Sequence, residues 1–173
     1  MGKVIKSLIG KLFTDKGRIV GAEEIQQILF HRNLKLLLDR VVMVGSTVVG
    51  EFKVTPEVCE GHEPAPGKPV YRGVDLIEMG FQLLGVFLAK NLDIVPSLQG
   101  KKVVAREVLS AKFSGFIFPG DTVFLEMKTD IFVEQFADVT IVESDRMIAR
   151  VNGKQKGQVA VSIVGFEPEK LEE

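Results

Sequence analysis

A histidine, a carboxylate and an amide that could do acid–base chemistry lie close together near the middle of this sequence. His62 is in a segment rich in glycine and proline, and Glu78 and Gln82 follow in an apolar stretch. Histidine is the side chain best suited to act as a general base near neutrality. Glu78 and Gln82 are four residues apart, so they share one face of a helix. This face is either solvated, as carboxylates usually are, or it lines a site.

Gly73 could add an oxyanion-binding function to these acid–base residues. It stands at the expected N-terminus of the helix that carries Glu78 and Gln82. Free backbone N–H groups and the positive end of the helix dipole at such a position can hold a developing oxyanion. His62 lies in a loop that could be held rigidly near that end. A single loop histidine is more often structural or solvated than catalytic, so this pattern alone leaves the function open.

The elements that must position these residues follow from the apolar periodicity. Helical spacing from about Val74 to Asn91 predicts one long helix, and residues 22–30 predict a short one with acidic residues early. Asn152-Gly153 predicts a two-residue hairpin turn. Strand-like segments rich in branched residues surround the long helix: 34–45, 46–55, 101–113, 121–133, 137–144, 146–151 and 154–166. We therefore predict a single α+β domain over residues 18–167, an antiparallel sheet around one long central helix.

The two ends of the chain are predicted to lie outside this domain. Residues 1–17 are predicted to form an amphipathic helix, because apolar residues recur at helical spacing and lysines lie mostly off that stripe. Its apolar face could pack on the body of the protein or on a sister subunit, or lie in a membrane interface. Residues 168–173 form a charged tail that is expected to fray.

Composition limits the possible classes of function. The chain has 173 residues, 46% hydrophobic and 26% charged, which is ordinary for one soluble domain. A net charge of −1 gives no general attraction to nucleic acid or anionic membranes. The single cysteine, Cys59, excludes an internal disulfide framework and favours the cytoplasm. No apolar run reaches the roughly 18–20 residues that span a bilayer.

Several motifs occur in an order that is typical of one family. They are "ILFHRNLKLLLDRVV", "GHEP", "RGVDLIEMGFQ", "AKFSGFIFPGD" and "VNGK". They resemble, in turn, the family's histidine-arginine and aspartate-arginine strand, its glycine-histidine-phenylalanine-proline loop, the start of its central helix, its proline-glycine-aspartate turn and its late hairpin. The family is that of the FabZ-type 3-hydroxyacyl-[acyl-carrier-protein] dehydratases of fatty-acid synthesis, with FabA-type enzymes as more distant relatives. The resemblance extends over most of residues 22–165.

This resemblance implies a hotdog fold, in which the sheet wraps the long helix and two subunits join edges to form paired active sites. It implies that His62 and Glu78 of the partner subunit are catalytic, and that Gly73, Val74 and Gln82 bind the oxyanion and substrate or support the acid. Dehydrating a 3-hydroxyacyl thioester needs a base at C2, an acid at the C3 hydroxyl and donors at the thioester oxygen. No metal or redox cofactor is implied.

Three departures from the family pattern leave other functions open. Glu63 replaces the phenylalanine after the histidine, Tyr71-Arg72 replaces methionine-proline, and two extra residues separate His62 from Glu78. Glu63 would favour the imidazolium form of a nearby His62, and Arg72 puts a cation near the oxyanion site, so both are possible tuning residues. The alternatives are a hotdog acyl thioesterase, in which a carboxylate activates water or attacks the thioester, and a non-catalytic acyl-binding relative.

The remaining expectations concern partners and other reactive residues. The resemblance implies a substrate on acyl carrier protein or coenzyme A, and a homodimer or higher oligomer. A basic rim that receives the acidic carrier could be formed by Lys101, Lys102, Arg106 and Lys112, although a solvated charged edge explains these residues equally well. Cys59 and His31 are interpreted as structural, and Asp121 as part of a turn.

Overall fold

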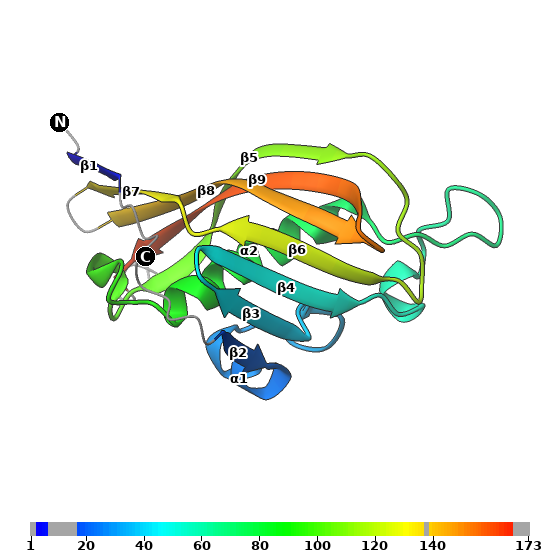
Figure 1. Ribbon diagram of the computed structural model, residues 1–173, viewed down its shortest axis with the longest axis horizontal. Helices are drawn as coiled ribbons and strands as arrows, with labels where there is room; N and C mark the ends of the chain where they lie inside the picture. Colours follow the sequence, from blue (N-terminus) through cyan, green and yellow to red (C-terminus); the bar gives the residue numbers. More distant parts are fainter. Residues whose placement is uncertain (1–2, 7–16, 137–138, 168–173) are drawn as a thin grey trace.

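One long helix lies against a curved antiparallel sheet in the computed structural model, which describes residues 3–6, 17–136 and 139–167 (Figure 1). The helix, α2, spans Gly73–Ala89, and a short helix, α1 (Ala22–Ile28), precedes the sheet's central strands. No helix within the described ranges is long and apolar enough to cross a membrane. This is the α+β hotdog arrangement that the sequence predicts, with the sheet wrapped around the central helix.

The described part of the sheet has nine strands, all paired antiparallel. Strand β8 pairs through its first half with β7 and through its second half with β6, while β9 runs along its other side. From β6 the sheet continues through β4 and β3 to β2, and from β9 to β5. The strands are β1 (Lys3–Lys6), β2 (Arg18–Gly21), β3 (Arg40–Val44), β4 (Thr47–Lys53), β5 (Lys102–Phe113), β6 (Thr122–Lys128), β7 (Ile131–Phe136), β8 (Val139–Val151) and β9 (Lys154–Phe166).

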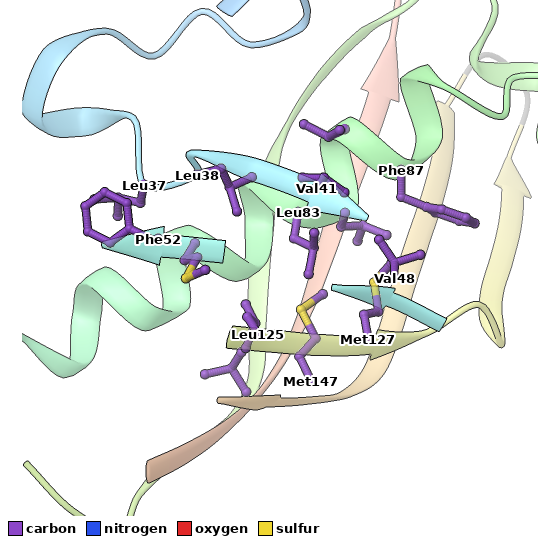
Figure 2. Packing of buried hydrophobic residues seen from close by; sticks show 14 of the residues in the cluster. Leu37, Leu38, Val41, Val48, Phe52, Leu83, Phe87, Leu125, Met127 and Met147 are labelled. Atoms are coloured by element: carbon purple, nitrogen blue, oxygen red, sulfur yellow. The ribbon is translucent and has the colours of Figure 1, made fainter. Parts of the chain in front are cut away.

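The core lies between α2 and the concave face of the sheet (Figure 2). Leu83 and Phe87 of α2 are fully buried against apolar residues of β3, β4, β6 and β8. Each such side chain contributes about 1.5–3 kcal/mol of burial free energy. Gly50 of β4 allows the close approach, since a Cβ there would lie 2.6 Å from Leu38 Cδ2 and 3.1 Å from Leu83 Cδ1. The helix that carries Glu78 and Gln82 is therefore held rigidly.

Two hairpins connect consecutive strands, and the second confirms the turn expected at Asn152-Gly153. Gly45, with φ of +55°, joins β3 to β4, and Asn152 and Gly153, with φ of +49° and +74°, join β8 to β9. Positive φ at both central residues is the conformation that an Asn-Gly hairpin turn requires. The expected helices at residues 22–30 and 74–91 are also confirmed, as α1 and α2.

Several predicted strand boundaries are wrong. The segment 34–45 forms a 3₁₀ turn, η1 (Asn33–Lys35), and becomes a strand only at Arg40. The segment 121–133 divides into β6 and β7, whereas the segments 137–144 and 146–151 belong to one strand, β8. A register shift between Ser144 and Met147 accommodates the polar residues there without ending the strand.

The predicted N-terminal helix is wrong at residues 3–6, which form β1 and pair with β7. Branched residues at positions 4 and 5 suit a strand, and the edge of β7 offers backbone partners that an isolated helix lacks. The rest of the predicted helix, residues 7–16, and the predicted tail, residues 168–173, lie outside the described residues.

Strand β5 forms an open edge of the sheet. Among the described strands it pairs only with β9, so its other side has no strand beside it. Most of β5 is exposed, including three apolar side chains: Val108 at 44%, Leu109 at 40% and Phe113 at 47%. A long apolar edge of this kind invites pairing with another chain.

Candidate active site

The carboxylate of Glu78 is held by two nitrogen atoms. Glu78 lies in the second turn of α2, and its Oε1 is 3.0 Å from Gln82 Nε2 and 2.9 Å from His31 Nε2. Gln82 is fully buried: its Oε1 accepts the Leu37 N–H at 2.8 Å, and its Nε2 donates to the Lys35 carbonyl at 2.7 Å. The structure thus brings Glu78 and Gln82 together on one helix face, as their spacing predicts.

His31 was not expected at this position. Its place in the sequence favours a structural role, whereas its imidazole lies directly against the Glu78 carboxylate. The two residues are far apart in sequence, so helical spacing gives no sign of the contact. The one available signal is the histidine-arginine pair, His31-Arg32, within the first motif that resembles the dehydratases.

Glu78 opens onto a cavity of about 820 Å³ that extends along α2. His31, Glu78 and Gln82 are among its polar lining residues. Beyond them the lining is mostly apolar and includes Phe81, Gly85, Leu88, Ala89 and Leu92, and its far wall is formed by residues 101–105 at the start of β5. A polar group at one place and an apolar groove beside it suit a ligand with a reactive head and a hydrocarbon chain.

His62 lies elsewhere, in the loop between the 3₁₀ turn η2 (Glu57–Cys59) and α2. Its backbone N–H donates to the Cys59 carbonyl at 3.1 Å, and its backbone carbonyl accepts the Val70 N–H at 3.0 Å. These two hydrogen bonds fix the backbone of the loop at His62. The exposed side of His62 faces a second cavity of about 430 Å³. Among the described residues, no hydrogen bond or ion pair joins His62 to Glu78, and one chain does not bring the two together.

Gly73 shares the cavity of His62. It is the first residue of α2, and Phe113, the last residue of β5, packs against it so closely that a Cβ on Gly73 would lie 2.7 Å from the ring. Only glycine fits under this ring without displacing it. The neighbouring Val74 is 61% exposed. The N-terminus of α2 and the imidazole of His62 therefore lie at one cavity, and Glu78 with Gln82 and His31 lies at the other.

Comparison with known proteins identifies the family. The model of the FabA-like domain matches residues 29–160. The chain belongs to the FabA-like family. It is 34% identical over 146 residues to the 3-hydroxyacyl-[acyl-carrier-protein] dehydratase FabZ of Clostridium acetobutylicum, covering 82% of this chain and 95% of that protein. The FabZ of Enterococcus faecalis is 35% identical over 145 residues, covering 82% and 94%.

Solved structures agree on the fold. The dehydratase heterocomplex ApeI:P from Xenorhabdus doucetiae superimposes with a TM-score of 0.62 at 14% identity, covering 85% of this chain and 93% of the other. At this identity the likeness shows the hotdog fold alone.

Arg72, which departs from the FabA-like pattern, has its positive charge paired with a carboxylate in the first turn of α2. Arg72 Nε and Nη2 each donate to Asp75, at 2.8 Å, in a two-point contact. These hydrogen bonds, together with the Asp75 charge, raise the pKa of Arg72. A fork of this kind fixes the orientation of both side chains. The cation is therefore committed to Asp75 and is not an isolated charge beside Gly73.

The other two replaced residues, Glu63 and Tyr71, differ in their surroundings. Glu63 is exposed, and within the described part of the chain no ion pair connects it to His62. A tuning role for Glu63 therefore stays a prediction. Tyr71 is buried beside Phe52, with 5.8 Å between ring centroids, and burial raises the pKa of its hydroxyl.

Cys59 is a packing residue of the core. Its side chain has no exposed surface, and burial raises the pKa of the thiol, with the Asp75 carboxylate adding to the effect. A nucleophilic cysteine needs an accessible thiolate. The geometry therefore opposes a thiol-based mechanism, in agreement with the structural interpretation of this residue.

The ion pair between Arg72 and Asp75 leads to a stability prediction. We expect Arg72→Ala to destabilise the fold by about 1 kcal/mol, because it leaves the mostly buried Asp75 carboxylate without its cation. The Arg72 side chain is 42% exposed, and solvent screening keeps the effect at this modest size. Thermal unfolding of the variant measures it, as a fall in Tm of about 2–4 °C.

Arg40→Ala is the matched control for this variant, because it breaks the more exposed pair between Arg40 and Glu51 on β3 and β4. We expect little change in Tm from it. An equal fall in Tm in both variants would show that the Arg72–Asp75 pair stabilises the fold no more than an exposed ion pair does.

Proposed function

We propose that this protein is a hydro-lyase that converts a 3-hydroxyacyl thioester into the trans-2-enoyl thioester and water in fatty-acid synthesis. The observation that carries the proposal is that the cavities of Glu78 and His62 lie at opposite ends of one open strand, β5, in a chain similar to FabZ dehydratases. Residues 102–105 of β5 line the Glu78 cavity, and Phe113 lines the His62 cavity.

An antiparallel dimer would complete the site. If two copies pair through β5, edge to edge, the first residues of one β5 lie beside the last residues of the other. The cavity of His62 then faces the cavity that holds Glu78 of the partner subunit. The open, apolar edge of β5 supports this pairing, because it offers both unpaired backbone groups and apolar side chains. We therefore propose a homodimer, or a higher oligomer built from it, with two shared sites.

The chemistry then follows from three groups. The imidazole of His62 removes a proton from C2, while the backbone N–H groups at Gly73 and Val74 hold the thioester oxygen as negative charge develops there. The Glu78 carboxyl gives its proton to the C3 hydroxyl, which leaves as water as the C2–C3 double bond forms. The proton on His62 later returns to Glu78 through solvent, so the enzyme is restored without a net change in charge.

Basic residues at both ends of β5 support acyl carrier protein as the carrier. Lys102 and Lys112 are exposed near the two cavities. In the proposed dimer, Lys112 of one chain lies on the same side as Lys102 of the other. Arg106, in contrast, is engaged with Glu107 and Glu143, so it contributes less to an open rim. A cytoplasmic location is part of this proposal.

The test is an assay with defined thioesters. Purified protein, with EDTA present, is incubated with 3-hydroxyacyl and trans-2-enoyl thioesters of both acyl carrier protein and coenzyme A, and the enoyl absorbance and free thiol are followed. We expect reversible interconversion without thiol release. Thiol release without interconversion would establish a thioesterase. The absence of both reactions would support the remaining alternative, a non-catalytic acyl-binding relative.

A further inference from the structure

We infer that His31 is a positioning residue that fixes which oxygen of Glu78 carries the catalytic proton. This inference rests on the proposed function and deepens it. Four observations carry it: the contact of His31 Nε2 with Glu78 Oε1, the fixed amide of Gln82, the environment of His31 Nδ1, and the packing around the imidazole.

The orientation of the Gln82 amide is determined by its neighbours. The backbone N–H of Leu37 can only donate, so the atom of Gln82 that faces it, at 2.8 Å, must be the oxygen. The amide nitrogen then faces the Lys35 carbonyl at 2.7 Å and Glu78 Oε1 at 3.0 Å, and donates one hydrogen to each. Glu78 Oε1 is therefore an acceptor.

The same oxygen fixes the tautomer of His31. An unprotonated Nε2 could contact Oε1 at 2.9 Å only by accepting a proton placed on Oε1, and the hydrogen of the neutral ring would then lie on Nδ1. His31 Nδ1 is buried and has no hydrogen-bond partner among the described residues. A hydrogen on Nδ1 would be a buried donor without an acceptor, which is costly. The imidazole is therefore neutral, with its hydrogen on Nε2.

Glu78 consequently has one oxygen for the protein and one for the substrate. Oε1 accepts from both His31 and Gln82, whereas no hydrogen bond to Oε2 occurs within the described part of the chain. The carboxyl proton belongs on Oε2, the oxygen left to face the cavity. Two donors to the same oxygen also hinder rotation of the carboxyl group, which keeps that proton directed at the departing hydroxyl.

The imidazole is itself held in place. The ring of Phe30 stacks on His31 with 4.3 Å between centroids and an interplanar angle of 25°. Arg32 Nη1 donates to the carbonyls of Leu29 and His31, at 2.6 and 2.7 Å, and so fixes the backbone that carries the ring. The stacking and the backbone hydrogen bonds together restrict the orientation of the imidazole, as a positioning role requires.

Kinetics of two variants test the inference. His31→Ala removes the donor, and we expect kcat to fall about tenfold to a hundredfold with KM nearly unchanged. His31→Gln can place an amide N–H near the position of Nε2, and we expect it to recover most of the lost kcat. A wild-type kcat in His31→Ala, or equal losses in both variants at unchanged Tm, would overturn the inference.

A second measurement does not depend on activity. The ring-nitrogen resonances of His31 in ¹⁵N-labelled, substrate-free protein report the tautomer directly. We expect a neutral ring with its hydrogen on Nε2, and a changed Nε2 resonance in Glu78→Ala. A hydrogen on Nδ1, or a charged ring at neutral pH, would overturn the inference even if the variants do not fold. A wild type that lacks dehydratase activity would instead refute the proposed function, and the tautomer would still be readable.

Discussion

His62→Ala and Glu78→Ala are each expected to be almost inactive alone and to regain activity when mixed. Each substitution removes one proton-transfer group, so each should lower kcat/KM at least about a hundredfold. His62 is exposed and Glu78 is partly exposed, so neither change creates a core cavity, and both variants should keep the fold. Circular dichroism and the rate of enoyl formation check these two statements.

Recovery on mixing follows from a site shared between chains. In a mixed dimer, one of the two sites receives both intact residues and the other receives neither. Random exchange of equal amounts makes half of the dimers mixed, so the expected recovery is about a quarter of wild-type activity. The double variant mixed with the single variants is the control and should stay inactive. No recovery in dimers proved to be mixed would place both residues in one subunit's site.

Val108→Asp is expected to convert the dimer to a monomer and to remove activity. Val108 lies near the middle of β5, so antiparallel pairing about that point brings the two copies of this position close together. Two new carboxylates at one interface repel each other and lose hydration. Because each chain supplies only one half of each site in the dimer that we propose, we expect activity to fall at least about a hundredfold. Light scattering after size-exclusion chromatography gives the oligomeric state.

Phe124→Asp is the matched control, since Phe124 is 40% exposed on β6, a strand with neighbours on both sides. It replaces an equally exposed apolar side chain away from the open edge, and the dimer and activity should persist. A monomeric Val108→Asp protein with full activity would contradict the shared site.

The fold was largely predictable because local signals and tertiary packing agree. The apolar period of α2 and the Asn152-Gly153 turn each determine their element directly. The boundary between β6 and β7 was missed, because the turn at residues 129–130 contains neither glycine nor proline. The single strand β8 was read as two, since polar residues at a bulge resemble a loop in sequence.

The site was predictable only where its members are close in sequence. Glu78 and Gln82 share a helix face by spacing, and the structure joins them. The contact of His31 with Glu78 arises from the packing of the segment after α1 against α2, which no local pattern encodes. The meeting of His62 with Glu78 of another chain that we propose is further removed, because it would depend on an edge of the sheet and not on the order of residues along one chain.

Cys59 offers a way to time the opening of the loop that holds His62. It is the chain's only cysteine, it has no exposed surface, and its carbonyl anchors the His62 backbone. A thiol reagent can reach the buried side chain only when the structure around it opens, so the labelling rate under native conditions reports the free energy of that local opening. The unmodified protein therefore carries its own probe of loop dynamics. A molecule that binds in the cavity of His62 should slow the labelling, which would reveal occupancy without any turnover.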